Sequence, residues 1–207
     1  PLDARNESAT GDTLGLRMWE AELVLTEVLA AQPHLVRGRR VLELGAGTGL
    51  AGVAAKQLGA ASVVLTDMLP AALDNLAWIA RANLCGEADS HIAVRRLSWA
   101  NPDETQLLEQ ADVFLAADCV YDPSDAPIFA IALSHALRRP GTLGIVASSV
   151  RNASTFAVMC AELERKGLPP PQPIDLASVP AVFRTRTCHM MTREWDRASV
   201  TVSLFTN

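Results

Sequence analysis

The sequence predicts an α/β fold in which helices cover both faces of a mostly parallel β-sheet. Strand-like and helix-like segments alternate from about residue 40 onward, which is the pattern of parallel strands joined by crossover helices. A glycine-rich turn directly follows the first strand-like segment, and an acidic residue ends the second. In a parallel sheet both features lie at the carboxyl edge of the strands, where ligands bind.

The N-terminal half supplies the first two strands and their helices. A helix is expected over residues 19–31, because apolar residues recur on one of its faces: Ala21, Val24, Leu25, Val28 and Leu29. Strands are expected over residues 39–47 and 61–67, and the second is rich in β-branched residues. The helix between them ends at Gly59, which is placed to cap its C-terminus. Pro70 lies in the first turn of the next helix.

The C-terminal half continues the alternation. The expected segments are strands at 91–97, 111–118 and 142–150, helices at 124–137 and 154–166, a proline-rich loop at 167–173, and a closing antiparallel pair at 182–194 and 198–205. The strand at 111–118 is apolar almost throughout, as expected of a strand that is buried on both faces.

Composition narrows the class of protein. The chain has 207 residues, of which 49% are hydrophobic and 20% charged, and this predicts one globular domain over residues 1–207, with residues 1–14 as a flexible lead-in. No apolar run is long enough to span a membrane, so we expect no membrane partner. The net charge of −5 argues against a nucleic-acid surface and suits a basic segment of a protein substrate.

The cysteines point to a reducing compartment. None of the four belongs to a CxxC pair: Cys85, Cys119, Cys160 and Cys188. We therefore expect neither a metal site nor a disulfide framework. Reduced thiols predict a cytoplasmic or nuclear protein, with the cytoplasm as the first expectation.

The glycine-rich turn is the first candidate binding feature. The segment VLELGAGTGLAG contains Gly45, Gly47, Gly49 and Gly52. Glycines let the backbone approach a ligand, and the N-terminus of the following helix is expected to attract an anion, here the methionine carboxylate of S-adenosylmethionine (SAM). Asp67 ends the second strand, where a carboxylate accepts hydrogen bonds from both hydroxyls of a ribose.

The same glycines also satisfy the GxGxxG pattern of nicotinamide dinucleotide sites. Glu43 favours SAM, because methyltransferases commonly carry an acidic residue just before the first glycine of the turn, whereas dinucleotide-binding strands usually carry an apolar one. The remaining alternative is a purely structural one, in which these glycines form a tight turn that binds no ligand.

The second candidate feature is the sequence Asp118-Cys119-Val120-Tyr121 at the end of the fourth strand. This position borders the central crevice of a doubly wound sheet. Asp118 would face a sulfonium and an incoming amine, whose positive charge a carboxylate stabilises, and the Tyr121 ring would wall the pocket. Alternatively, Asp122 or Asp125 caps the next helix, and Tyr121 is merely packed.

These residues together resemble the family 16 protein methyltransferases, which are seven-β-strand lysine methyltransferases. The motifs that carry the resemblance, in order, are GLRMWEAELVL, VLELGAGTGLAG, VVLTD, RRLSW and FLAADCVYD. The resemblance covers residues 15–168 and combines the D-x-x-Y motif with Trp19-Glu20-Ala21. It implies a Rossmann-like, class I SAM-dependent methyltransferase fold with seven strands, the last of them antiparallel.

The resemblance also assigns site residues. The expected cofactor-binding residues are Trp19, Glu43, Gly45, Ala46, Gly47, Asp67, Met68, Trp99 and Ala117. Asp118 and Tyr121 would shape the channel for the target lysine and are the expected catalytic residues. Residues 13–25 and 148–168 resemble the family members that methylate elongation factor 2, which makes this factor, or another lysine-bearing protein, the expected substrate.

Other functions fit the same residues. A methyltransferase for another side chain or for a small molecule would share the turn and the strand ends. A nicotinamide-dependent oxidoreductase and a non-catalytic SAM-fold binding module are the remaining alternatives.

Overall fold

A computed structural model describes residues 15–83, 92–101, 104–149, 153–182 and 199–206. The expected lead-in, residues 1–14, and nearly all of the expected strand at 182–194 lie outside these ranges.

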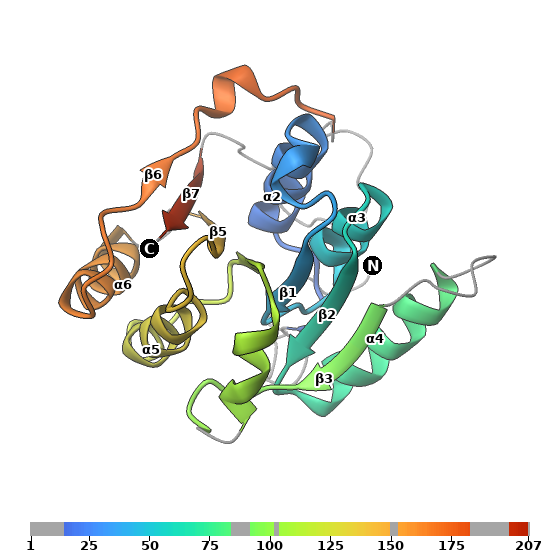
Figure 1. Cartoon of the computed structure of the whole chain (residues 1–207), viewed down its shortest axis with the longest axis horizontal. Coiled ribbons are helices and arrows are strands. Elements are labelled where there is room, and N and C mark those ends of the chain that lie inside the picture. The colour runs from blue at the N-terminus through green and yellow to red at the C-terminus, as the bar shows by residue number, and fades with distance from the viewer. Residues whose placement is uncertain (1–14, 84–91, 102–103, 150–152, 183–198, 207) are drawn as a thin grey trace, which may run out of the picture.

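The predicted alternation of strands and helices is confirmed (Figure 1). The helices are α2 (Glu20–Ala31), α3 (Leu50–Gln57), α4 (Pro70–Ala82), α5 (Ala126–Ala136) and α6 (Ala153–Arg165). The strands are β1 (Arg40–Leu44), β2 (Ser62–Asp67), β3 (Ile92–Arg96), β4 (Val113–Ala117), β5 (Leu143–Ser149), β6 (Gln172–Pro173) and β7 (Val200–Thr206). Three short 3-10 helices, which the sequence analysis missed, are η1 (Pro33–Leu35), η2 (Glu104–Gln110) and η3 (Leu176–Ser178). Gly59 ends α3 with a φ of 97° and Pro70 begins α4, both as predicted.

The strands form one seven-stranded sheet in the order β3-β2-β1-β4-β5-β7-β6. The pairs among β1 to β5 are parallel, whereas β7 runs antiparallel to both β5 and β6. The chain order reverses between β1 and β4, so a crevice forms beyond the carboxyl ends of these two strands.

Helices cover both faces of the sheet and create two hydrophobic cores. In Figure 1, α2, α3 and α4 lie on one side of the sheet, and α5 and α6 lie on the other. Strand β1 is buried on both faces, because Val41 belongs to the core under α2 and α3 while Leu42 belongs to the core under α5 and α6.

Helix α2 is more deeply buried than its predicted single apolar face requires. Every residue from 21 to 29 is buried, including Glu22 and Glu27. The helix packs against α3, β4, β5 and β7. The backbone N–H of Val182 also donates to Oε1 of Glu27 at 2.6 Å, so a segment from the other end of the chain covers α2.

One expectation for the C-terminal region needs correction. The segment 167–173, expected to be a loop, contains β6, whose Gln172 and Pro173 pair with Leu204 and Ser203 of β7. The described antiparallel partners of β7 are β5 and β6, and the expected pairing with the segment 182–194 falls on residues that, apart from Val182, lie outside the described ranges. A two-residue strand that contains proline carries no periodic signal, which is why the sequence did not reveal it.

None of the helices within the described ranges is long and apolar enough to cross a membrane.

Candidate active site

A cavity of about 760 Å³ lies beyond the carboxyl ends of the parallel strands. This volume suits a small-molecule ligand. All residues expected to bind a cofactor or to act in catalysis line this cavity: Trp19, Glu43, Gly45, Ala46, Gly47, Asp67, Met68, Trp99, Ala117, Asp118 and Tyr121. Strands β1, β2 and β4 bring them together because their carboxyl ends lie side by side in the sheet.

The glycine-rich turn keeps its backbone close to the cavity. Gly45, Gly47 and Gly49 have φ values of 59°, 51° and 72°, in the left-handed region that favours glycine. A Cβ at Gly45 would lie 2.9 Å from Cβ of Cys119 and 3.4 Å from the Trp99 ring. The packing of the turn against Cys119 and Trp99 therefore leaves no room for a side chain at this position.

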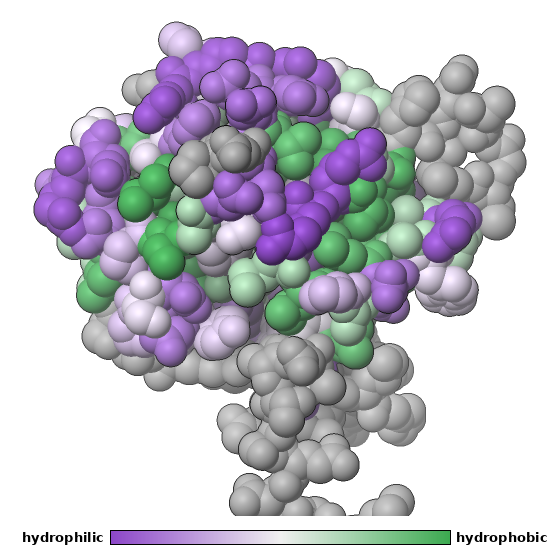
Figure 2. Space-filling model, turned by 90° about the horizontal axis from the view of Figure 1, so that it is seen from below, coloured by the Kyte–Doolittle hydropathy of each residue, from purple (hydrophilic) through white to green (hydrophobic). Residues whose placement is uncertain are grey.

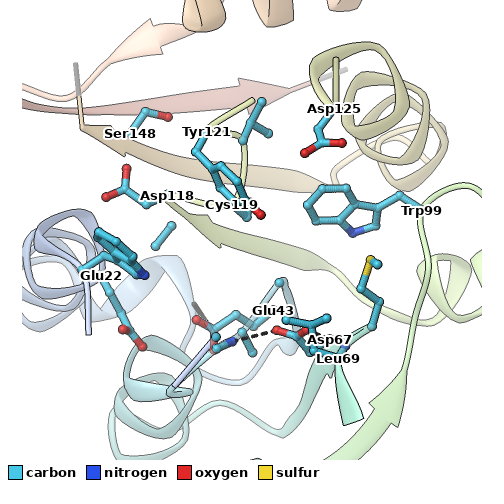
Figure 3. Close-up of a pocket in the computed structure, with 18 of the residues that line it drawn as sticks. Glu22, Glu43, Asp67, Leu69, Trp99, Asp118, Cys119, Tyr121, Asp125 and Ser148 are labelled. Carbon is cyan, nitrogen blue, oxygen red and sulfur yellow. Dashed lines mark hydrogen bonds between the residues drawn. The ribbon is translucent and has the colours of Figure 1, made fainter. Parts of the chain in front are cut away.

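Asp67 supports the turn from the neighbouring strand. Its Oδ2 accepts a hydrogen bond from the Gly47 N–H at 3.1 Å, and its Oδ1 accepts one from the Leu69 N–H at 3.0 Å. A carboxylate offers about four acceptor positions, so Asp67 retains capacity for further donors. The figure of the cavity shows its carboxylate and the Gly47 bond (Figure 3).

Two buried carboxylates occupy the N-terminus of α3. Oε1 of Glu22 accepts from the Leu50 N–H at 2.7 Å, and Oε2 of Glu43 accepts from the Gly52 N–H at 2.8 Å. Glu22 also accepts from the hydroxyl of Thr48 at 2.7 Å. Two of the first-turn amides of this helix therefore have protein partners, and the binding of the methionine carboxylate of SAM at this helix end stays a prediction.

Burial changes the acidity of these groups. Burial raises the pKa of Glu22 to about 7, against the opposing hydrogen bonds from Thr48 and Leu50. Burial, followed by the nearby Glu22, raises the pKa of Glu43 well above its usual value. Burial also raises the pKa of the Cys119 thiol, which therefore stays protonated at neutral pH.

Asp118 occupies an uncommon backbone conformation at the end of β4. Its φ is 49°, the only positive value of a non-glycine residue in the described part of the chain. Its N–H donates to the Ala147 carbonyl of β5 at 3.0 Å. Both of its carboxylate oxygens accept hydrogen bonds from Ser149, the last residue of β5. Such conformations cost free energy and cluster at functional sites.

The structure does not agree with the purely structural alternative, in which Tyr121 is a packed residue and Asp122 or Asp125 caps the next helix. Tyr121 is 65% exposed, so it is not a packed core residue. Asp125 is the N-cap of α5, but its side chain makes no capping hydrogen bond. Asp122 accepts instead from the N–H and the hydroxyl of Ser124 within its own loop. Desolvation and the nearby Asp125 raise the pKa of Tyr121.

Aromatic side chains form part of the cavity wall. Trp99 packs edge-on against Phe129 of α5, with ring centroids 5.1 Å apart and an interplanar angle of 72°. The guanidinium of Arg17 lies 5.4 Å from the ring centroid of Trp19. Figure 3 shows the Tyr121 ring near the centre of the view, the Trp99 indole to its right, and the Asp125 carboxylate above the indole. Met68, Tyr121 and Ile128 are exposed at its rim.

The cavity is rich in acidic groups. Its described lining contains five carboxyl groups: Glu22, Glu43, Asp67, Asp118 and Asp125. Arg17 is the one basic residue of that lining. The face seen from below, toward which β1 and β2 point in Figure 1, carries both hydrophobic and hydrophilic residues (Figure 2). Such a site favours cationic and partly apolar ligands over anionic ones.

Four lining residues were not singled out from the sequence, namely Arg17, Glu22, Ser149 and Thr155, and Asp125 was considered only as a helix cap. The sequence contains one indication of Glu22: it is an acidic residue in a helix in which most of its neighbours are apolar. The hydroxyl of Thr155 is buried without a hydrogen-bond partner, and nothing in the sequence marks it. Within the described ranges, no group of three or more His, Cys, Asp or Glu side chains is placed to hold a metal ion.

Solved structures define the class of fold. Magnesium protoporphyrin IX methyltransferase of Synechocystis, with bound S-adenosylhomocysteine (SAH), superposes with a TM-score of 0.57 at 13% identity, covering 91% of this chain and 84% of that one. A putative O-methyltransferase of Nostoc punctiforme superposes with a TM-score of 0.58 at 15% identity, covering 88% and 55%. This likeness concerns the fold alone: the chain has the Rossmann-like fold of class I SAM-dependent methyltransferases.

Sequence comparisons define the family. Methyltransferase family 16, described as lysine methyltransferase, matches residues 2–160. Protein-lysine N-methyltransferase EFM3 of Chaetomium thermophilum is 32% identical over 174 residues, covering 80% of this chain and 52% of that protein. EEF1A lysine methyltransferase 3 of Mus musculus is 34% identical over 151 residues, covering 70% and 62%. The chain belongs to the family 16 lysine methyltransferases, and it spans about half the length of the curated relatives it matches.

Membership of this family decides between the interpretations of the glycine-rich turn. The turn is that of a methyltransferase and not that of a nicotinamide-dependent oxidoreductase, in agreement with the position of Glu43 in the sequence.

Proposed function

We propose that this chain is a SAM-dependent N-methyltransferase that modifies a lysine of a protein. The observation that carries the proposal is a pair of carboxylates at the ends of β2 and β4, the two strands that flank β1: Asp67 and Asp118 both line one cavity (Figure 3). Membership of the lysine methyltransferase family supports it. The acidic lining also supports it, because a lysine ammonium is attracted to such a cavity and the phosphates of nucleic acid are repelled.

The residues present fit SAM. The cavity volume of about 760 Å³ accommodates a nucleoside with an amino-acid tail. Asp67 keeps acceptor capacity for ribose hydroxyls, and the absence of a side chain at Gly45 lets the turn pack against Cys119 and Trp99 at the cavity wall. The residues we propose around SAM are Trp19, Glu43, Gly45, Ala46, Gly47, Asp67, Met68, Trp99 and Ala117. Glu43 acts through the turn, because its Oε2 binds the Gly52 N–H.

When bound, SAM would supply an electrophilic methyl group: the neutral lysine nitrogen would attack the methyl carbon in line, SAH would leave with the electron pair of the C–S bond, and the methylated ammonium could release a proton to solvent. The protein aligns the reacting atoms, and such alignment supplies roughly 7–11 kcal/mol of a barrier. The amine must be neutral to attack, and removal from water favours its neutral form. A carboxylate opposes this effect, so Asp118 positions the amine and does not act as its base. The ring of Tyr121 forms part of the wall of the channel that the target lysine enters.

We propose elongation factor 2 as the first candidate substrate. The support is the resemblance of residues 13–25 and 148–168 to the family members that methylate this factor. Relatives of this chain carry names that refer to EEF1A and to calmodulin, so those two proteins are the natural comparison substrates. The free thiols of Cys119 and Cys160 support a reducing compartment, the cytoplasm or the nucleus.

The test is incubation of the purified chain with tritiated SAM and, separately, elongation factor 2, EEF1A and calmodulin. Mass spectrometry then identifies the labelled residue. We expect label on a lysine, and first on elongation factor 2. Label on arginine, histidine or a small metabolite would contradict the proposal. A companion thermal-shift experiment compares SAH with NAD and NADP, and stabilisation by NAD alone would overturn the methyltransferase assignment.

A further inference from the structure

Ser149 holds the Asp118 carboxylate with two hydrogen bonds. The backbone N–H of Ser149 donates to Oδ1 of Asp118 at 2.6 Å. The hydroxyl of Ser149 donates to Oδ2 of the same carboxylate, also at 2.6 Å. One residue of β5 therefore binds both oxygens of the acid that ends β4. Hydrogen bonds to a charged acceptor are short and strong, so they fix its orientation.

The backbone directs the carboxylate of Asp118 toward this partner. The left-handed φ of 49° turns the chain at the end of β4, and the Asp118 N–H binds the carbonyl of Ala147. Strand β4 pairs in parallel with β5 up to Ala117 and Ala147. Asp118 and Ser149 thus lie just beyond the last residues at which β4 and β5 pair with each other. Both line the cavity, and Figure 3 shows Asp118 beside the β5 residue Ser148.

We propose that Ser149 is a positioning residue for methyl transfer, acting through Asp118. This inference rests on the proposed function, in which Asp118 lies beside the target amine. An aspartate side chain has two rotatable bonds. Without a fixed partner, the carboxylate would adopt several rotamers, and the amine bound to it would adopt several positions. The N–C bond forms as the C–S bond breaks, with the electron pair passing to sulfur, and this requires the nitrogen on the axis of the C–S bond. A carboxylate of Asp118 that is fixed by Ser149 therefore also fixes the position of the amine that donates to it.

The fold does not need the Ser149 hydroxyl. Ser149 pairs with Val200 of β7 through the backbone, and its N–H would still reach Oδ1 of Asp118 after loss of the hydroxyl. The variant Ser149→Ala therefore removes the bond to Oδ2 alone. Ser149→Thr keeps a hydroxyl on the same backbone. Ser178→Ala is a matched control, because the Ser178 hydroxyl binds the Asp175 carbonyl in the exposed η3 segment.

The test is steady-state kinetics on the protein substrate together with SAH binding by calorimetry. For Ser149→Ala we expect kcat to fall about 10- to 100-fold, because a small misplacement of a reacting group has an effect of this size. SAH affinity and the melting temperature should stay near wild type. Ser149→Thr should recover most of kcat, and Ser178→Ala should behave as wild type.

A double-mutant cycle shows whether Ser149 acts through Asp118. In an Asp118→Ala background, the additional change Ser149→Ala should leave kcat unaltered. Additive losses would overturn the inference, and so would full activity of Ser149→Ala or a joint collapse of melting temperature and SAH binding. A wild-type chain that methylates no protein overturns the proposed function and this inference together. An active wild type with an equally active Ser149→Ala overturns the inference alone.

Discussion

Gly47 donates its backbone N–H to Oδ2 of Asp67 at 3.1 Å, so the residue that ends β2 supports the turn that follows β1. The same carboxylate binds the Leu69 N–H, which begins the connection to α4. The Asp67 side chain therefore binds two backbone segments at the edge of the cavity, the turn after β1 and the start of the connection to α4. Its removal should affect both of these contacts.

Asp67→Ala should weaken SAH binding by about 1.5–3 kcal/mol, because charge-assisted hydrogen bonds to the ribose are lost. Isothermal titration calorimetry measures this change. Asp175→Ala is the matched control, since Asp175 also accepts a backbone N–H, from Ala177, but lies in an exposed segment. Equal SAH affinity in wild type and Asp67→Ala would show that Asp67 only supports the turn.

Gly45→Ala should abolish SAH binding and destabilise the domain. The new Cβ would lie 2.9 Å from Cβ of Cys119, and the left-handed φ of 59° is strained for alanine. Gly141→Ala separates these effects, because Gly141 has a φ of 81° but nothing within 4 Å of its added Cβ. That control should cost about 1–2 kcal/mol in urea unfolding and leave SAH binding intact. Similar behaviour of both variants would argue against a close approach at Gly45.

Asp118→Ala and Tyr121→Phe should lower kcat/KM for the protein substrate far more than they weaken SAH binding. Both residues follow β4 and line the cavity, and their proposed role concerns the target amine. We expect losses of about 100-fold for Asp118→Ala and about 10-fold for Tyr121→Phe. Asp122→Ala in the same loop is the control, because Asp122 binds Ser124. Full activity of both variants would make the D-x-x-Y motif structural.

Stability should fall as pH rises from about 5 to 8. Burial raises the pKa of Glu22 to about 7, so between pH 4.5 and 7 the folded state binds more protons than the unfolded state. The stabilisation is complete below the unfolded pKa and is lost as pH rises through the folded one. Urea unfolding should show a loss of about 1–3 kcal/mol.

Glu22→Gln should flatten this pH dependence, because its amide oxygen still accepts from Leu50 and Thr48 but carries no charge. Glu164→Gln, a change of the same kind on the exposed side of α6, should leave the slope unchanged. A slope that persists in Glu22→Gln would assign the effect to another group, first of all Glu43, whose pKa burial also raises.

The sequence by itself determined the order of strands and helices and the position of the cavity. Hydrophobic periodicity and turn residues are local properties, and they placed α3, α4 and the parallel strands correctly. Asp67 and Asp118 could be predicted to share one site because each ends a parallel strand, and parallel strands end at one edge.

Only the tertiary structure decided which side chains complete that site. Glu22 reaches the amide of Leu50 across 28 residues of sequence, and Ser149 reaches Asp118 across 31. The same holds for β6, whose two residues become a strand only because β7 lies beside them. Contacts of this kind join single residues that lie far apart in the sequence, so they depend on how helices and strands pack in three dimensions and have no periodic pattern of their own.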